Sequence, residues 1–234
     1  MFNGSTVLLT GVGREGQVGE VVARAFADLG ASVLLVDRTP EQVEARAAAI
    51  VAVGKQATAY ACDLSDADAV GALAQRVREE HGPLQALVHM AGGFAMSGPV
   101  AESDVVVWTK QISINLTTAY VTSRAFLPLL REGKGSIVFF ASEAALPGSS
   151  VANKAAYSVA KSGVVTLMRA IAAEEKKRGV RANAIAPASI RTASNVEAMG
   201  EDVHYVEREQ VADVVIYLCS ARASAITGSL LPVT

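Results

Sequence analysis

The chain has 234 residues, of which 51% are hydrophobic and 19% are charged, and its formal net charge is −2. This apolar fraction excludes a disordered chain, and the near balance of charges gives no general attraction for nucleic-acid phosphate. No Pro/Ser-rich or charge-dense stretch divides the sequence, so we expect a single domain spanning residues 1–234. No window reaches the ~18 apolar residues of a membrane span, and no signal peptide is visible. These features predict a cytoplasmic protein whose partners are small molecules, with no nucleic acid and no membrane.

The cysteines and histidines do not form a metal-binding pattern. Cys62 and Cys219 lie far apart, each in an apolar run, which is typical of buried thiols. His81, His89 and His204 show no metal-ligand spacing. We therefore expect no metal site.

Short apolar runs alternate with longer Ala-rich segments of helical periodicity, which is typical of βαβ units. The apolar runs do not alternate with polar residues, as strands covered on both faces require. The sequence therefore predicts an α/β protein, a single-domain Rossmann-type doubly wound parallel sheet of about seven strands with helices on both faces. The predicted strands are Ser5–Thr10, Ser32–Asp37, Gln56–Ala61, Leu84–Met90, Gly135–Ser142, Arg181–Ala186 and Ser229–Val233. Pro232 predicts that the last strand lies at the sheet edge.

Glycines mark the ends of most of the predicted helices. The helices are Val18–Leu29, Glu41–Val53, Asp66–Glu80, Ser103–Leu130, Asn153–Arg178 and Glu209–Ala221. The helix Asn153–Arg178 is rich in Ala, Val and Gly on more than one face, so it needs a partner besides the sheet. We expect that partner to be a second copy of the chain, in a homodimer or homotetramer.

A glycine-rich turn follows the first predicted strand. Gly11, Gly13, Gly16 and Gly19 stand between this strand and the first helix, where missing Cβ atoms let the backbone approach a pyrophosphate at the helix N-terminus. Asp37 ends the second strand about 20 residues later, as in dinucleotide-binding folds. The placement of these residues predicts a dinucleotide site.

The residues around this turn bear on which nucleotide it binds. Gln17 and Val18 stand where a P-loop needs Lys and Ser/Thr, which excludes a nucleoside triphosphatase. Asp37 can accept hydrogen bonds from the adenosine ribose hydroxyls and would repel a 2′-phosphate, so NAD is favoured. Arg14 and Arg38 could instead neutralise a 2′-phosphate, so NADP stays open.

Tyr157 and Lys161 lie four residues apart at the start of a predicted helix, so both side chains share one face. The ammonium would then stabilise the phenolate and lower the tyrosine pKa from its usual ~10. Ser142 ends the fifth strand at the carboxyl edge of the sheet, where ligands bind in doubly wound folds. Together the three residues predict proton transfer to a carbonyl or from an alcohol.

Over nearly its whole length the chain resembles the classical-type short-chain dehydrogenase/reductase (SDR) family. The matching motifs are the Thr-Gly that begins the glycine loop, Asp63-Leu64, Ala91-Gly92-Gly93, Asn115, Ser142, Tyr157-x-x-x-Lys161, Asn183 to Pro187 and Thr192. The resemblance implies an NAD(P)-dependent oxidoreductase that transfers a hydride between nicotinamide and a carbonyl/alcohol substrate.

The resemblance also assigns roles to residues. Tyr157 would be the acid/base, Ser142 would polarise the substrate carbonyl, Lys161 would hold the nicotinamide ribose and tune Tyr157, and Asn115 would support a water leading from Lys161 to bulk solvent. The cofactor-binding residues it implies, together with those of the glycine loop, are Gly11, Gly13, Arg14, Gly16, Gln17, Val18, Asp37, Arg38, Asp63, Leu64, Ala91, Gly92, Gly93, Tyr157, Lys161, Pro187, Ile190 and Thr192.

The sequence departs from the family pattern in several places. With Gly19 aligned as the last glycine, the glycine loop is two residues longer than usual, so the glycine that faces the pyrophosphate is not fixed. A loop of that length resembles enoyl reductases, which place six residues between Tyr and Lys, whereas this chain has three. His89 replaces an asparagine that helps hold the sheet, and we interpret it as a packed replacement.

The substrate side of the sequence is the least informative. The segment from Thr192 to Glu209, where the family has a lid, is short, and Phe94, Met96, Leu146 and Val151 predict only an apolar rim. The C-terminal sequence resembles dihydropteridine reductases, although Ser142 argues against close identity. A dihydropteridine-reductase-like activity, an enoyl-reductase-like activity and a non-catalytic NAD(P)-binding regulatory protein remain as alternatives.

Overall fold

The computed structural model describes all 234 residues and contains one seven-stranded sheet in the order β3-β2-β1-β4-β5-β6-β7. Every neighbouring pair of strands is parallel. The strands are β1 (Thr6–Thr10), β2 (Ser32–Asp37), β3 (Ala57–Ala61), β4 (Ala86–His89), β5 (Ser136–Phe140), β6 (Arg181–Pro187) and β7 (Leu230–Val233). All seven predicted strands are present, and Pro232 lies in the edge strand β7, as predicted.

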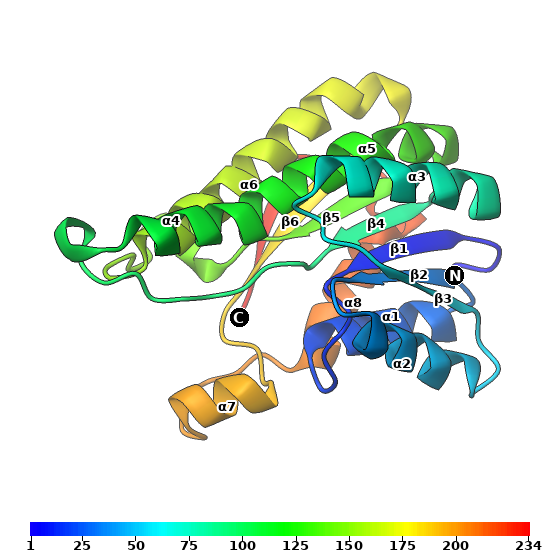
Figure 1. Ribbon diagram of the computed structural model, residues 1–234. Helices are drawn as coiled ribbons and strands as arrows, with labels where there is room; N and C mark the ends of the chain where they lie inside the picture. The colour runs from blue at the N-terminus through cyan, green and yellow to red at the C-terminus, as the bar shows by residue number, and fades with distance from the viewer.

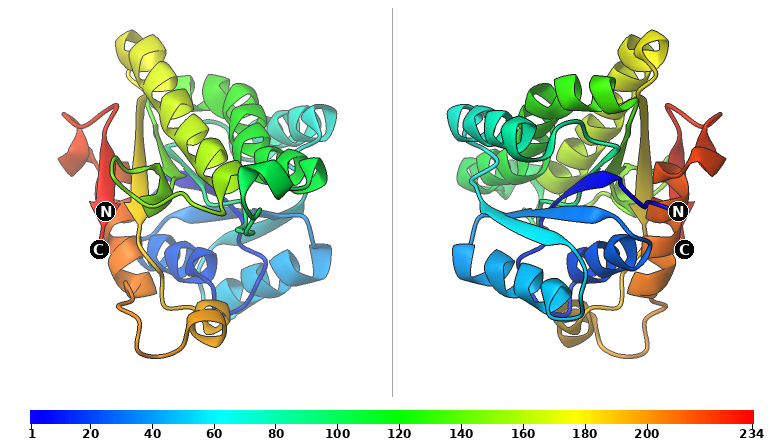
Figure 2. Two further views of the ribbon diagram at one scale, coloured as in Figure 1. Left: turned by 90° about the vertical axis from the view of Figure 1, so that its left-hand side faces the viewer. Right: turned by 90° about the vertical axis from the view of Figure 1, so that its right-hand side faces the viewer.

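Helices cover both faces of the sheet (Figures 1 and 2). They are α1 (Val18–Asp28), α2 (Pro40–Val51), α3 (Ala67–His81), α4 (Val105–Ile112), α5 (Thr118–Gly133), α6 (Ala155–Glu175), α7 (Ala193–Met199) and α8 (Arg208–Cys219). One core lies under α3, α5 and α6, and a second lies under α1, α2 and α8. The predicted doubly wound fold is confirmed.

Strand β1 shows why the strand sequences are continuously apolar and do not alternate with polar residues. Leu8 packs into the core under α3, α5 and α6, whereas Val7 and Leu9 pack into the core on the opposite face. Successive side chains of a strand point to opposite faces, and both faces here are covered. An alternating pattern would have placed polar groups in one of the two cores.

The predicted helix Ser103–Leu130 is wrong as a single helix. The structure divides it into α4 and α5, joined by a π-helical turn over Ser113–Thr117. Such turns insert a residue into the helical repeat and occur often at functional sites. Here the turn holds Asn115, whose Nδ2 donates to the backbone carbonyl of Gln111. Apolar periodicity does not register this one-residue insertion.

Helix α7, which lies in the segment from Thr192 to Glu209 where a lid was expected, is not predicted from the sequence. Thr192 caps this helix by accepting a hydrogen bond from the N–H of Asn195. None of its residues is buried, so it lacks the apolar face from which a helix is predicted. No helix of the chain is long and apolar enough to cross a membrane.

The chain reverses its direction of winding between β1 and β4, which lie side by side in the middle of the sheet. Loops that leave these two strands diverge to opposite faces and leave a crevice at the carboxyl edge. Both cysteines are buried free thiols, as predicted. The residues expected to carry chemistry follow β1, β2, β3, β4 and β5 at this same edge.

Candidate active site

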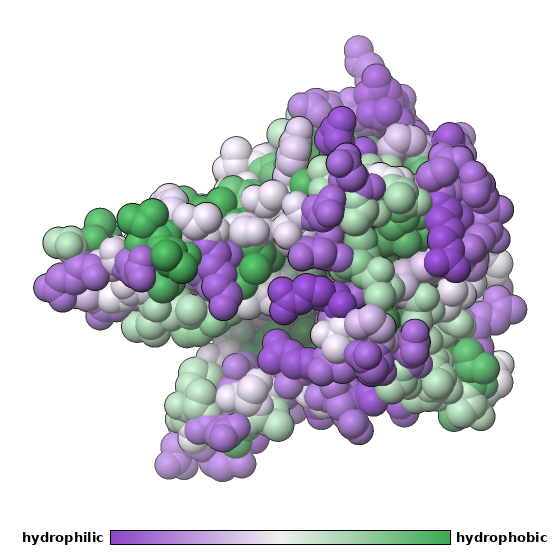
Figure 3. Space-filling model, viewed as in Figure 1, coloured by the Kyte–Doolittle hydropathy of each residue, from purple (hydrophilic) through white to green (hydrophobic).

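Two connected pockets lie at the carboxyl edge of the sheet, where the surface is hollowed (Figure 3). The glycine-loop pocket has a volume of about 560 Å³ and runs from Gly11 past Asp37 to Thr118. The tyrosine pocket has a volume of about 380 Å³ and contains Tyr157 and Lys161. Met90 and Gly92 line both, so the two pockets are continuous.

The glycine loop approaches the rest of the backbone too closely for any larger residue. A Cβ added to Gly19 would lie 2.5 Å from the carbonyl oxygen of Gly11, and one added to Gly11 would lie 2.8 Å from the amide nitrogen of Ala91. Gly11 also has a φ of 75°, which disfavours side chains. Gly19 is therefore the glycine that lets α1 pack against the first turn, which fits its alignment as the last glycine of the motif. The cradle fits a pyrophosphate at the N-terminus of α1.

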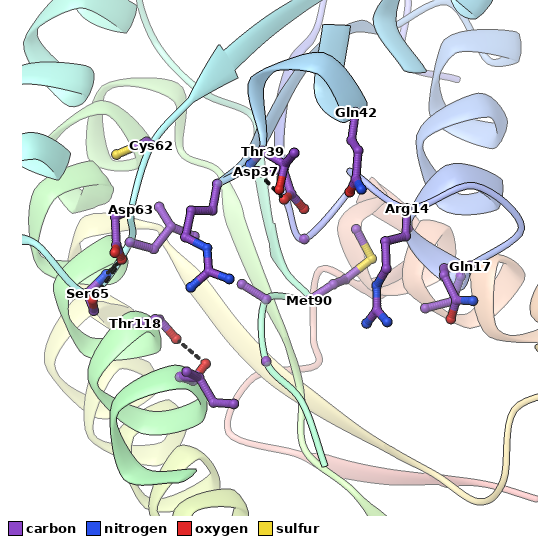
Figure 4. A pocket seen from close by; sticks show the side chains of 18 of the residues that line it. Arg14, Gln17, Asp37, Thr39, Gln42, Cys62, Asp63, Ser65, Met90 and Thr118 are labelled. Carbon is purple, nitrogen blue, oxygen red and sulfur yellow. Dashed lines mark hydrogen bonds between the residues drawn. The ribbon is translucent and has the colours of Figure 1, made fainter. Parts of the chain in front are cut away.

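Asp37 closes the adenosine end of the glycine-loop pocket (Figure 4). Its carboxylate accepts hydrogen bonds from the backbone N–H groups of Gly13, at 2.8 Å, and of Thr39, at 3.3 Å. Arg14 and Arg38 line the same pocket, so groups of both charges surround the place of a ribose. A carboxylate and two guanidinium groups therefore line one pocket.

The opposite wall of this pocket is formed by the turn after β3. Asp63 accepts hydrogen bonds from the N–H and the hydroxyl of Ser65, and these bonds hold the pKa of the carboxyl below its usual range. Leu64 is buried and lines the pocket. The cap of α3 is Asp66, not Asp63. Asp63 therefore both stabilises the turn through Ser65 and lines the pocket.

His89 joins the two central strands at the base of the site. Thr10 Oγ1 accepts hydrogen bonds from the N–H groups of Met90 and Ala91 and lies 3.1 Å from His89 Nδ1. His89 Nε2 lies 3.3 Å from the hydroxyl of Thr118, which donates to the carbonyl of Ile114. Thr10 Oγ1 already accepts two hydrogen bonds, so its hydroxyl proton is donated to His89 Nδ1. The Thr118 hydroxyl proton is already donated to Ile114, so the Thr118 oxygen accepts a hydrogen bond from His89 Nε2–H. Burial lowers the pKa of His89 to about 3, so the ring is neutral and acts as a packed replacement.

Ser142, Tyr157 and Lys161 meet in the tyrosine pocket. Ser142 follows β5, and the other two lie one turn apart on α6. Lys161 Nζ donates to the carbonyl of Phe140 at 2.8 Å and lies 5.8 Å from the centroid of the Tyr157 ring. The serine, the phenol and the ammonium therefore share one cavity, as the sequence predicted.

Asn115 holds the loop after β4, which lies next to Lys161. Its Oδ1 accepts a hydrogen bond from the N–H of Gly93, and its Nδ2 donates to the Gly93 carbonyl at 2.9 Å. A Cβ on Gly92 would lie 2.5 Å from Asn115 Oδ1 and 3.5 Å from Lys161 Nζ, so the loop after β4 passes between these two side chains. Asn115 itself is buried and does not line either pocket.

The prediction that Lys161 lowers the pKa of Tyr157 is not met in this structure. Burial raises the pKa of Tyr157, and only the Ser142 hydroxyl opposes that rise. Burial also lowers the pKa of Lys161 to about 8. The ammonium donates to the Phe140 carbonyl, and burial is the main cause of the raised phenol pKa.

Most of the predicted cofactor residues line the two pockets, but three do not. Gly13 and Gly16 do not line either pocket, and Thr192 caps α7. Pro187 and Ile190 line the tyrosine pocket, as does Gly93. Ala188 and Ser189, within the predicted range Pro187 to Thr192, also line the tyrosine pocket. Residues not predicted to bind the cofactor also line the pockets: Thr39, Gln42, Cys62, Ser65, Met90, Lys110, Ile114 and Thr118 in the first, and Phe140, Ala141, Glu143, Ala144, Lys154, Asn195 and Met199 in the second. Many of them are sequence neighbours of predicted site residues, and that closeness in sequence is the signal that could have identified them.

The predicted apolar rim is only partly correct. Phe94 lines the tyrosine pocket and packs edge-on against the Tyr157 ring, with centroids 5.0 Å apart. Met96, Leu146 and Val151 do not line it. Met199 of α7 takes their place, because the unpredicted helix folds over the substrate side.

Comparison with known proteins agrees with this geometry. A family model described as enoyl-(acyl carrier protein) reductase matches residues 11–234. The chain is 33% identical to 2-keto-3-deoxy-L-fuconate dehydrogenase of Xanthomonas campestris pv. campestris, over 97% of this chain and 78% of the relative. It is also 33% identical to cis-4-hydroxycyclohexanecarboxylate dehydrogenase of Sinomonas cyclohexanicum, over 92% of this chain and 90% of the relative.

Solved structures give the same result. The crystal structure of levodione reductase superposes with a TM-score of 0.92 at 30% sequence identity, covering 100% of this chain and 97% of that chain. Both relatives are named as dehydrogenases, and the solved structure is named as a reductase. The chain therefore belongs to the short-chain dehydrogenase/reductase family and is an oxidoreductase that acts on CH–OH and C=O groups with a nicotinamide cofactor.

Proposed function

We propose that this enzyme interconverts a secondary alcohol and its ketone, with Tyr157 as the acid/base. The observation that carries the proposal is the meeting of Ser142, Tyr157 and Lys161 in a pocket that continues into the glycine-loop pocket. The nicotinamide, when bound, accepts the hydride that leaves the carbinol carbon. The residues of the chain must then remove the hydroxyl proton and hold the oxygen.

Each residue has a role that its position supports. Tyr157 takes the proton from the substrate hydroxyl in oxidation and returns it to the oxygen in reduction. The Ser142 hydroxyl orients that oxygen, and its hydrogen bond to the phenol opposes the rise that burial causes in the Tyr157 pKa. Lys161 holds the nicotinamide ribose and carries a proton near neutral pH, because its pKa of about 8 lies above that range. Asn115 fixes the loop after β4 beside the ammonium.

The proposed cofactor is NAD rather than NADP. Asp37 stands at the ribose end of the glycine-loop pocket and is fixed there by the N–H groups of Gly13 and Thr39. A carboxylate so held would accept hydrogen bonds from the ribose hydroxyls and repel a 2′-phosphate. The pyrophosphate is assigned to the glycine loop, the adenine to Asp63 and Leu64, and the nicotinamide end to Pro187 and Ile190, with Thr192 supporting them through the cap of α7.

A homo-oligomer is the proposed assembly. Exposed apolar side chains gather on α4, where Val105, Val106 and Trp108 are 73%, 71% and 43% exposed. Figure 3 shows hydrophobic surface over this helix, and Tyr120 of α5 is also 54% exposed. A patch of this kind marks an interaction surface. The sequence predicts that helix α6 contacts the second copy, but Val159 is the one large apolar residue of α6 that is exposed. A Val106→Lys variant should shift the protein to monomer in size-exclusion chromatography with light scattering.

The free thiols of Cys62 and Cys219 fit a cytoplasmic location.

The experiment that tests the proposed function follows NADH formation with a panel of secondary alcohols. The panel includes cis-4-hydroxycyclohexanecarboxylate and cyclohexanol, together with the reverse reaction on cyclic diketones. Crotonyl-CoA and a quinonoid dihydropterin test the enoyl-reductase and dihydropteridine-reductase alternatives. Turnover of an alcohol or ketone supports the proposal, and turnover of only crotonyl-CoA or the pterin contradicts it. NADH binding without any turnover would indicate the non-catalytic alternative.

A further inference from the structure

The outer edge of the lengthened glycine loop is fixed by side chains from three helices. Arg208, the first residue of α8, donates from Nη1 to the carbonyl oxygen of Gly16 at 2.7 Å. The N–H of Gly16 donates to Glu20 of α1, also at 2.7 Å. Arg46 of α2 lies 3.5 Å from carboxylate oxygens of both Glu20 and Glu15. Both backbone polar groups of Gly16 are therefore held from outside the pocket.

The bond from Arg208 determines how one peptide group of the loop is oriented. In a trans peptide the carbonyl of Gly16 and the N–H of Gln17 point in opposite directions, and the chain has no cis peptide bond. With the carbonyl held toward α8, the N–H of Gln17 turns away from α8. Gln17 is the N-cap of α1, so this N–H is among those that have no partner within the helix. Gln17 and Val18 line the glycine-loop pocket, and Figure 4 shows Gln17 beside Arg14 in this pocket.

We propose that Arg208 is a positioning residue that aims the Gln17 N–H at the cofactor pyrophosphate. The inference rests on the proposed binding of a nicotinamide dinucleotide in this pocket. Gly16 has a φ of 68°, so the peptide plane next to it can rotate at little steric cost. A loop with two additional residues also loses more conformational entropy when it is ordered around a ligand. Arg208 orders the loop before the cofactor binds, and this lowers the cost of binding.

The same residue links the loop to the substrate side of the site. Glu207, which precedes Arg208, pairs with Arg191 at 2.9 Å, and Arg191 also pairs with Glu201 at 2.8 Å beyond α7. Arg191 lies between the pocket-lining residue Ile190 and the α7 cap Thr192. Arg208 therefore connects the loop that holds the pyrophosphate to the segment that carries α7.

The test compares Arg208→Met with Arg24→Met. Methionine keeps an apolar stem and removes the donor to Gly16. Arg24 is the matched control, because it lies 3.8 Å from the same Glu20 but is 56% exposed and makes no bond to the loop. Binding of NADH is measured by fluorescence titration, binding of adenosine by competition with NADH, and kcat at saturating cofactor.

We expect Arg208→Met to raise the Kd for NADH about tenfold, with kcat at saturating NADH changed by less than about threefold. Adenosine, which lacks the pyrophosphate, should bind as it does to the wild type, and Arg24→Met should leave all three values unchanged. Arg208→Lys retains a donor and should recover part of the loss. If Arg208→Met does not fold, Arg208→Lys carries the test, with an expected rise in the NADH Kd of about threefold.

Two results would overturn the inference while the proposed function stands. One is a folded Arg208→Met variant whose NADH Kd lies within about twofold of the wild-type value. The other is an equal loss of affinity for NADH and adenosine, which would indicate general damage to the pocket. A wild-type protein that binds neither NADH nor NADPH would overturn the proposed function, and this inference with it.

Discussion

The carboxylate of Asp37 accepts a hydrogen bond from the backbone N–H of Gly13 at 2.8 Å, which ties the end of β2 to the glycine loop. A Cβ at Gly13 would lie 2.6 Å from the Asp37 carboxyl carbon, so only glycine allows this approach. The residue proposed to select the cofactor is thus hydrogen-bonded to the loop proposed to bind it.

Cofactor preference follows from the charge of Asp37. Wild-type protein should bind NADH more tightly than NADPH, and Asp37→Ala should reduce or reverse the difference, because the repulsion of the 2′-phosphate disappears while Arg14 and Arg38 remain. Loss of the bond to Gly13 affects both cofactors alike, so the ratio of the two Kd values isolates the charge effect. A wild-type preference for NADPH of about tenfold, or about 1.4 kcal/mol, would show that the arginines decide.

The neutral His89 makes stability depend on pH. Its pKa of about 3 in the folded protein lies below the usual 6.5, so the unfolded state binds a proton that the native state does not bind between these values. This contribution to stability is fully present above pH 6.5 and is lost as the pH falls toward 3. At pH 5 the loss relative to neutral pH amounts to about 2 kcal/mol.

Urea unfolding at pH 7.5 and at pH 5 measures this effect. His89→Asn should be less stable than the wild type at pH 7.5 but should lose less stability on acidification. His204→Asn is the control, because His204 is exposed, and should follow the wild type. Parallel losses in the wild type and in His89→Asn would contradict the assignment.

The substrate range depends on the short segment around α7. This helix has no buried residue and is held by the Tyr205 hydroxyl, which donates to the Gly200 carbonyl at 2.6 Å and lies 3.2 Å from the Asn195 carbonyl. A lid with few contacts supplies little remote binding energy and excludes water poorly. Several unrelated secondary alcohols should therefore be oxidised with weak KM values. If a monomeric form of the protein oxidised a single substrate with a micromolar KM, this would contradict the prediction of a broad substrate range.

Removal of the Lys161 ammonium should affect both cofactor binding and chemistry. Lys161→Met keeps the buried stem but removes the donor to the Phe140 carbonyl and the proposed ribose contact. We expect a higher Kd for NADH in fluorescence titration and a lower kcat than that of the wild type. A variant with unchanged NADH affinity would exclude the ribose contact.

The fold was predictable because its strands and most helices follow local patterns. Apolar runs such as β2 and the glycines after helices are visible in a single sequence. The π-helical turn at Asn115 and the exposed α7 are not, because neither changes the apolar periodicity that the prediction uses. The bond from Arg208 to Gly16 joins residues 192 positions apart, and no local pattern encodes such a contact.

The candidate site shows the same division. Spacing and order brought Ser142, Tyr157 and Lys161 to one cavity, as predicted. The direction of the Tyr157 pKa shift was wrong, because spacing on a helix gives the distance between a cation and a phenol but not their burial. Desolvation depends on how many other segments cover the pair, which only the folded structure defines.

Hydride transfer by the Tyr157→Phe variant tests the central claim most directly. Phenylalanine keeps the ring and its edge-on packing with Phe94 but has no proton to exchange with the substrate oxygen. Purified, folded variant should bind NADH like the wild type, and its kcat on any accepted alcohol or ketone should fall by roughly 10²–10⁴-fold. If the variant retained more than about a tenth of wild-type kcat, against this expected loss, Tyr157 would not be the acid/base.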